Sequence, residues 1–148
     1  MLKLPPPGWA LLYLIAAGTL SWMYPWRRLL DLRLVWLGLP LIAIALALAL
    51  WAISLFRFEG TEINPTSKVN KSLVIRGPYR FTRNPMYLAL VLLTLGIAFT
   101  VGSLPMFAVP LLIFATANWV HIPFEEAKMR RQFSLAFGAY TSEVRRWI

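Results

Sequence analysis

One unbroken apolar run restricts the possible folds of this chain most strongly. From Leu34 to Phe56 the sequence carries no ionisable side chain, and its length is about that needed by a helix to cross a hydrocarbon core of ~30 Å. The chain as a whole is 59% hydrophobic and contains seven tryptophans among 148 residues, which is more apolar surface than one small soluble core can bury. The sequence therefore predicts an all-α integral membrane protein.

Residues 9–23 form an earlier apolar run that also predicts a span. A tryptophan stands near each end, at Trp9 and Trp22, as is typical of membrane interfaces. A secretory signal peptide is the alternative, but no small-residue cleavage site follows the run. We therefore expect a retained first helix.

The last apolar region, from Met86 to Trp119, is too long for one span. Gly102 and Pro105 interrupt it near its centre, so a tight helical hairpin is expected, with a kink at Pro110 in its second arm. The sequence thus predicts one membrane domain over residues 1–148, with about four transmembrane helices at residues 9–23, 34–56, 86–101 and 105–120.

The charge distribution predicts the topology. The chain has 15 Lys and Arg against 6 Asp and Glu, a formal net charge of +9. In a soluble domain this excess would indicate nucleic acid, but here the charges lie between apolar runs, so we expect anionic lipid head groups as partners and no nucleic acid. The positive-inside rule places the basic loop 57–85, the tail 121–148 and both termini on the cytoplasmic face.

Residues 72–87 form the densest polar stretch of the loop. They read Ser-Leu-Val-Ile-Arg-Gly-Pro-Tyr-Arg-Phe-Thr-Arg-Asn-Pro-Met-Tyr. The Gly-Pro and Asn-Pro pairs favour turns, and Pro85 suits the first turn of the helix that follows. An ordinary basic membrane loop is the alternative reading. Two tyrosines and two prolines are more than charge-based anchoring needs.

The tail 121–148 is expected to form an amphipathic helix, because Met129, Phe133, Phe137 and Tyr140 recur at helical spacing. Gly138 is expected to interrupt it. Such a helix lies in the head-group layer of the membrane and is able to serve as a lid as well.

The junction before this helix carries its polar candidates. Asn118, His121 and Glu125 are separated by three and four residues, which would align them on one helical face, although Pro123 is expected to kink or restart the helix. A lone interfacial histidine is more often a head-group neighbour than a catalyst. The adjacent carboxylates of Glu125 and Glu126 repel each other, so they should meet cations or ligand hydroxyls.

These residues carry a resemblance to a known superfamily. The stretch Arg76-Gly77-Pro78-Tyr79-Arg80-Phe81-Thr82-Arg83-Asn84-Pro85-Met86-Tyr87, then a helical hairpin, Glu125-Glu126 and Phe137-Gly138-x-Tyr140, resembles the integral membrane isoprenylcysteine carboxyl methyltransferases and phospholipid methyltransferases, as a short, prokaryotic-type member. The resemblance covers the chain from about Phe58 to its carboxyl end. It implies S-adenosylmethionine as methyl donor, a pocket on the cytoplasmic side of a prokaryotic cell membrane, and a lipid-like acceptor that enters from the bilayer.

The resemblance also implies the site residues. Arg83, Asn84, Pro85 and Tyr87 match the arginine, histidine, proline and tyrosine motif of the superfamily, with asparagine in place of histidine, and Glu143 stands where many relatives carry an arginine implicated in substrate handling. Arg145 or Arg146 would then take over that role. The expected catalytic residues are Arg83, Glu125 and Arg145. The expected cofactor-binding residues are Gly77, Pro78, Tyr79, Arg80, Arg83, Asn84, Pro85, Tyr87, His121, Glu125 and Glu126.

The chemistry of these residue types agrees with this implication. A sulfonium donor offers cationic groups, a carboxylate, hydroxyls and a flat ring, which carboxylates, an arginine and aromatic side chains bind. Methyl transfer needs no metal and no covalent nucleophile, and the chain has no cysteine. An ammonium acceptor must first lose a proton, for which Glu125 or Glu126 is the candidate base. The acceptor stays open among prenylated cysteine, phospholipid amine, isoprenoid and small thiol.

Two other classes compete with a membrane methyltransferase. A small transporter predicts an acidic residue within a span, but every Asp and Glu lies outside the apolar runs. A lipid-binding scaffold would leave the Gly-Pro-Tyr and Asn-Pro-x-Tyr turns unexplained. A soluble Rossmann methyltransferase is excluded, since the sequence has no glycine-rich strand-to-helix turn.

Overall fold

The protein is helical throughout the part that its computed structural model describes, which is residues 4–24, 31–58, 60 and 72–148. Within these ranges there is no strand. The elements in chain order are α1 (Pro6–Met23), α3 (Val35–Phe58), the 3-10 turn η1 (Gly77–Arg80), α4 (Pro85–Val101), α5 (Leu104–Thr116), the π-helical turn η2 (Ala117–His121) and α6 (Ile122–Glu143). The turn signal at Asn64-Pro65 lies outside the described residues.

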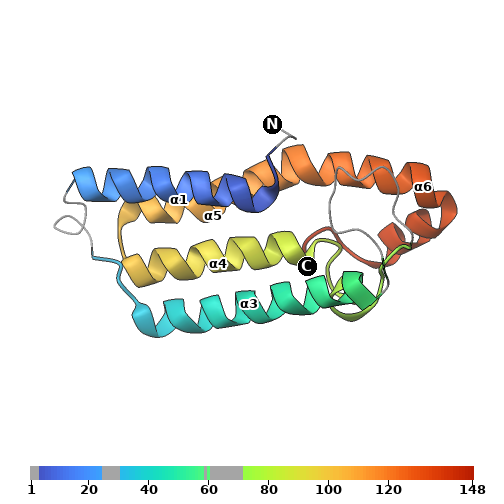
Figure 1. Cartoon of the computed structure of the whole chain (residues 1–148), viewed down its shortest axis with the longest axis horizontal. Helices are drawn as coiled ribbons and strands as arrows, with labels where there is room; N and C mark the ends of the chain where they lie inside the picture. The colour runs from blue at the N-terminus through green and yellow to red at the C-terminus, as the bar shows by residue number, and fades with distance from the viewer. Residues whose placement is uncertain (1–3, 25–30, 59, 61–71) are drawn as a thin grey trace.

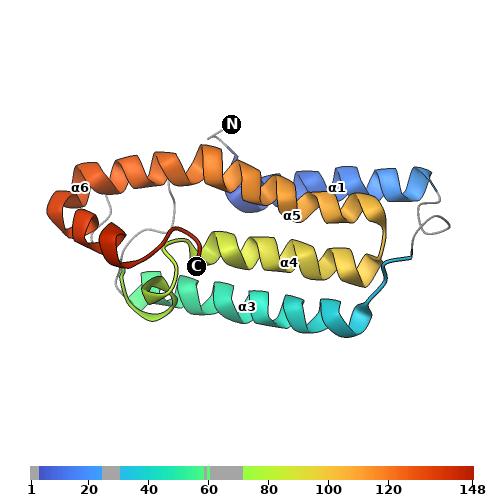
Figure 2. The same ribbon diagram turned by 180° about the vertical axis from the view of Figure 1, so that it is seen from behind.

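Helices α1, α3, α4 and α5 lie side by side along the long axis of the molecule (Figures 1 and 2). Helix α4 packs between α3 and α5, and α1 packs on α5. The bounds of α1, α3 and α4 agree with those of the expected helices to within a few residues, and α5 begins one residue before the start expected for the fourth. Helix α3 and the continuous helix from Leu104 to Glu143 are long and apolar enough to cross a membrane, whereas α4 is a shorter apolar helix.

Helices α3 and α4 approach each other closely at two glycines. A Cβ atom on Gly96 would lie 2.8 Å from the carbonyl oxygen of Gly38, and one on Gly38 would lie 2.7 Å from the carbonyl oxygen of Gly96. Only residues without a side chain permit this backbone contact. It joins the first turns of α3 to the last turns of α4, at the end of the bundle opposite to loop 72–84.

The hairpin between α4 and α5 is as tight as expected. Gly102 ends α4 in the left-handed conformation, with φ of 73°, and its amide donates to the carbonyl oxygen of Ala98 at 2.7 Å. Ser103 then precedes the first residue of α5. Glycine suits this position because a left-handed backbone carries no penalty there.

The second arm of the hairpin does not stop at residue 120, contrary to expectation. Pro123 stands in the first turn of α6, directly after the π-helical turn η2, and the helical chain continues through α5, η2 and α6 from Leu104 to Glu143. A ~30 Å core takes up about twenty residues. The part of this helix from Glu125 onward therefore extends past the length that a membrane crossing needs, as the overhang of α6 beyond the bundle shows (Figure 1).

The tail helix bends at Ser134, which corrects the expected interruption at Gly138. Ser134 has φ of 37° and ψ of −106°, whereas the chain passes through Gly138 in helical conformation and ends α6 at Glu143. The bend turns the last part of the chain back, so that the carboxyl end lies beside the first turn of α4 (Figure 1). Loop 72–84 and the tail thus meet at one end of the bundle.

Candidate functional site

The loop that precedes α4 is held in place by its glycine and its buried tyrosine. Gly77 has a φ of 58°, and a Cβ there would lie 2.7 Å from Cδ1 of Leu55 in α3. Tyr79 is buried against the end of α3, beside Phe56, and its carbonyl oxygen accepts a 2.6 Å hydrogen bond from the hydroxyl of Tyr140. The loop is therefore fixed between α3 and the tail.

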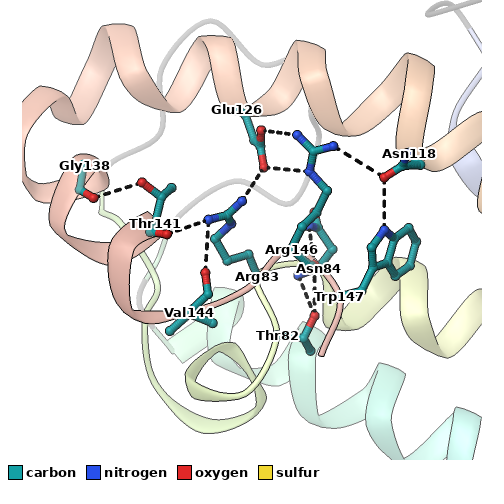
Figure 3. Close-up of polar contacts among 10 residues, drawn as sticks. All are labelled: Thr82, Arg83, Asn84, Asn118, Glu126, Gly138, Thr141, Val144, Arg146 and Trp147. Carbon is teal, nitrogen blue, oxygen red and sulfur yellow. Dashed lines mark hydrogen bonds and ion pairs between the residues drawn. The ribbon is translucent and has the colours of Figure 1, made fainter.

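Glu126 is the centre of an ion-pair cluster at this end of the bundle. Its Oε1 accepts hydrogen bonds from Nη2 of Arg83 at 2.9 Å and from Nε of Arg146 at 3.1 Å, and its Oε2 accepts one from Nη2 of Arg146 at 2.7 Å. Figure 3 shows the two guanidinium groups on either side of the carboxylate. Burial alone would raise the pKa of Glu126, but the hydrogen bonds and charges of Arg146 and Arg83 outweigh it and lower this pKa. Glu126 is thus ionised and saturated with cationic donors.

The carboxyl-terminal segment, residues 144–148, ties the loop to the tail. The amide of Arg83 donates to the carbonyl oxygen of Arg145 at 3.0 Å, and Nη1 of Arg83 donates to that of Val144 at 3.0 Å. The side chains of Thr82 and Asn84 donate to the carbonyl oxygen of Arg146 at 3.2 and 2.9 Å. These bonds run along one continuous stretch of backbone (Figure 3).

Asn118 in η2 anchors the same segment from the other side. Its Oδ1 accepts from Nε1 of Trp147 at 3.1 Å and from Nη1 of Arg146 at 3.4 Å. The Trp147 ring lies 4.7 Å from the ring of Phe114, centroid to centroid. A π-helical turn often marks a functional site, and here it carries the residue that positions the chain end.

The second carboxylate, Glu125, has a different environment. Its Oε1 accepts a 2.6 Å hydrogen bond from the hydroxyl of Tyr87. Burial raises the pKa of Glu125, the Tyr87 hydrogen bond and the charge of Lys128 oppose that rise, and the charge of Glu126 adds to it, so that this pKa is about 7. The two neighbouring glutamates therefore differ in protonation, and Glu125 titrates near neutral pH. Pairs of carboxylates with separated pKa values are typical of acid-base sites.

His121 lies next to Tyr87, the hydrogen-bond partner of Glu125. Its ring stacks on the ring of Tyr87 with centroids 6.2 Å apart, and it is 3% exposed. Its Nε2 atom is buried and has no hydrogen-bond partner among the described residues. His121 therefore packs against the hydroxyl donor of Glu125.

A cavity of about 700 Å³ joins these polar residues to the apolar helices. Its polar part is lined by Arg83, Asn84, Glu125, Glu126 and Lys128, and its apolar part by side chains of α3 and α4 such as Ala49, Ile53, Ala89 and Leu93. Leu4 and the prolines at the start of α1 also line it. One space thus offers both charge and hydrocarbon surface to a ligand.

Comparison with protein families identifies the chain. The family of phospholipid methyltransferases matches residues 34–136, which is more than half of the chain. The chain belongs to the phospholipid methyltransferase family. This family is part of the isoprenylcysteine carboxyl methyltransferase-like superfamily. Comparison with curated proteins and with solved structures found no match.

Membership of the phospholipid methyltransferase family implies methyl transfer to a lipid-type acceptor. The matched region, residues 34–136, contains most of the residues that the sequence analysis expects at the site. Among the expected residues, the cavity is lined by Tyr79, Arg83, Asn84, Pro85, Tyr87, His121, Glu125 and Glu126. Gly77 and Pro78 shape the loop without lining the cavity, and the side chain of Arg80 is exposed. No group of residues that would hold a metal occurs in the described part of the chain.

The carboxyl end of this methyltransferase family member lies outside the matched region, and the structure distinguishes its two arginines. The side chain of Arg145 is exposed and only its carbonyl oxygen contacts the loop, whereas Arg146 binds Glu126 and Asn118. Nothing in the sequence separates two adjacent arginines. Lys128 is not among the residues expected to form the site, although its position three residues after Glu125 places both on one face of a helix.

Proposed function

We propose that the protein transfers a methyl group from S-adenosylmethionine to a lipid-like or membrane-partitioned acceptor at the cytoplasmic membrane face. The observation that carries this proposal is the cavity of about 700 Å³, which is polar at Glu125 and Glu126 and apolar between α3 and α4. Ligand sites of this size are usually apolar with a few placed polar groups. A site that holds a polar methyl donor beside a lipid chain needs both a polar and an apolar part, and this cavity has both.

The residues present fit the donor. Carboxylates, an arginine and the rings of Tyr79 and Tyr87 line the cavity, and they complement cationic groups, a carboxylate and a flat ring. Nε of Arg83 and Nε2 of His121 are buried without a hydrogen-bond partner in the described structure. A buried unsatisfied polar atom is costly, and a bound ligand would supply partners.

The orientation of the site follows from the charge distribution. Loop 72–84 and the tail lie at one end of the bundle (Figure 1), and their basic residues favour the cytoplasmic side under the positive-inside rule. The exposed side chains of α3, among them Trp36, Ile44 and Leu50, then face lipid. The apolar part of the cavity lies between helices that border the bilayer, so a lipid-like acceptor reaches the site from the membrane.

The chain's own groups would act by binding, positioning and proton transfer. Bound S-adenosylmethionine supplies an electrophilic methyl group on a sulfonium centre. Arg83 and Glu126 hold the loop against the tail at the polar part of the cavity. The Tyr87 hydroxyl orients Glu125, whose carboxylate accepts the proton that an ammonium acceptor must lose. An acceptor that is already a carboxylate or thiolate would not need this step.

Ligand binding to the purified protein tests the proposal. A ligand that binds the native state raises apparent stability, so S-adenosylhomocysteine, the demethylated product, should raise the thermal midpoint in detergent. In Glu125→Gln the binding should weaken by about 1.5 to 3 kcal/mol, the value of a hydrogen bond to a charged group. Absence of any shift at saturating product would contradict the enzyme and favour the lipid-binding scaffold.

The acceptor is found by a second experiment. Membranes that contain the protein are incubated with methyl-labelled S-adenosylmethionine, and the labelled product is extracted and identified. Label in a lipid or lipidated fraction, absent with Glu125→Gln, is the expected result. Label confined to water-soluble products would contradict a membrane-partitioned acceptor.

A further inference from the structure

Lys128 is a buried cation that the proposed reaction does not yet use. It lies on α6, it is 7% exposed, and it lines the cavity together with Glu125. Burying an ammonium group is costly unless an anion or several hydrogen-bond acceptors surround it. A lysine at this place therefore needs a physical reason.

The charges that line the cavity lie in two groups, one around Glu126 and one around Glu125. Arg83 and Glu126 bind each other, and Arg146 completes the coordination of Glu126. Glu125 accepts a hydrogen bond from the hydroxyl of Tyr87. Lys128 is the lining cation that stands outside the Glu126 cluster, and it makes an interaction of its own within the chain.

The surroundings of Lys128 favour a ligand anion. Phe137 and Tyr140 are buried and line the same cavity, so an attraction between charges is screened less here than in water. A lysine presents a compact charge with three donors on a flexible stem, which suits carboxylate or phosphate oxygens of a ligand that enters and leaves.

We propose that the Lys128 ammonium binds an oxyanion of a cavity ligand, either a carboxylate or a phosphate, and thereby selects ligands that carry one. The inference rests on the proposed function and adds a specificity-determining residue to it. The oxyanion has two possible sources, which are the amino-acid carboxylate of the methyl donor and the phosphate or carboxylate of an acceptor head group.

Two pairs of probes distinguish the sources by thermal stabilisation of the detergent-purified chain. S-adenosylhomocysteine carries the carboxylate, whereas 5′-methylthioadenosine lacks the amino-acid part. Dioctanoyl phosphatidate carries a phosphate, whereas dioctanoylglycerol does not. Each probe is titrated against the wild type, Lys128→Met and Lys128→Arg, with Lys128→Gln beside them in case the methionine variant does not fold. Arg131→Met, which removes an exposed cation from the same helix, is the matched control.

The expected result is an affinity loss of about tenfold or more in Lys128→Met for one anionic probe, with less than twofold change for its partner without the anion. Loss for S-adenosylhomocysteine assigns the oxyanion to the donor, and loss for phosphatidate assigns it to the acceptor. Lys128→Arg should retain part of the affinity, and Arg131→Met should equal the wild type. If Lys128→Met and Lys128→Gln both bind both anionic probes within twofold of the wild-type affinity, the role of Lys128 is overturned and the proposed function is not. A wild type that does not bind S-adenosylhomocysteine overturns the proposed function, while the phosphatidate pair still tests Lys128.

Discussion

The hydroxyl of Tyr87 donates a 2.6 Å hydrogen bond to Oε1 of Glu125, across 38 residues of sequence. It joins the first turn of α4 to the start of α6. The bond stabilises the ionised form of a carboxyl group whose pKa burial raises to about 7. Tyr87 is thereby a positioning residue for the proposed base.

Removing this hydroxyl should shift the pH dependence of methyl transfer to an ammonium acceptor. If the ionised Glu125 accepts the proton, the rate rises with pH through its pKa of about 7. Tyr87→Phe removes a bond that lowers this pKa, so the rising limb should move to higher pH by roughly one unit. Rate profiles against pH check this. Tyr13→Phe, which loses a 3.0 Å bond to Thr116, is the control, and an unmoved limb in Tyr87→Phe would exclude the positioning role.

Glu125→Gln should change how stability depends on pH. The pKa of Glu125 is raised from 4.5 to about 7 on folding, so the folded state holds the proton more tightly than the unfolded state, and stability falls as pH rises from about 4.5 through 7. Glutamine cannot ionise. Between pH 4.5 and pH 8 the free energy of unfolding of the variant should therefore rise, relative to that of the wild type, by on the order of 2 to 3 kcal/mol. Thermal midpoints of both proteins across this range measure the gain, and a constant difference would contradict it.

Glu126→Gln should destabilise the protein more than Arg146→Ala. The side chains of Arg83 and Glu126 are 13% and 14% exposed, whereas that of Arg146 is 34% exposed. Losing the shared carboxylate leaves a largely buried cation unpaired and should cost about 3 kcal/mol, while losing the outer arginine should cost about 1 kcal/mol. Unfolding in denaturant measures the free energy of unfolding of Glu126→Gln and Arg146→Ala. Arg145→Ala, which removes an exposed side chain, should change stability by less than about 0.5 kcal/mol, and a reversed order would mean that the cluster is not centred on Glu126.

Ser134→Gly should stabilise the tail. Ser134 has φ of 37°, a region that strains a residue with a side chain. Glycine adopts it without that strain, so a gain of about 1 kcal/mol is expected. Ser142→Gly, at a position in the regular last turns of α6, should instead cost about 0.5 kcal/mol. Thermal unfolding of both variants tests the sign, and destabilisation by Ser134→Gly would contradict the strained bend.

Gly96→Ala should separate α3 from α4. A Cβ at Gly96 would lie 2.8 Å from a backbone oxygen of α3, whereas one at Gly18 in α1 has no neighbour within 4 Å. Overpacking of this kind costs roughly 1 to 3 kcal/mol, while Gly18→Ala should be neutral or slightly stabilising. Equal thermal midpoints for the two variants would show that the helices tolerate a wider spacing.

Much of this protein follows from local pattern. The apolar runs predicted the helices and their bounds except for the end of the last one, because helix formation and membrane length depend on consecutive residues. The Gly102 turn of the hairpin and the turns of loop 72–84 followed from glycine and proline, whose backbone preferences are local. The family resemblance, confirmed by the match over residues 34–136, rested on the order of these same motifs.

Other features were decided only when distant segments packed together. Whether Arg145 or Arg146 faces Glu126 depends on how the chain turns at Ser134. No sequence signal marks a bend there, and the interruption was predicted at Gly138 instead. The partnership of Tyr87 with Glu125, the cavity and the burial of Lys128 each need α4 and α6 to be brought to one place. The sequence by itself determined the helices and the candidate residues, since each depends on near neighbours. The tertiary structure alone decided which charges meet, because burial and distance set the energy of a charge and neither is a property of its place in the sequence.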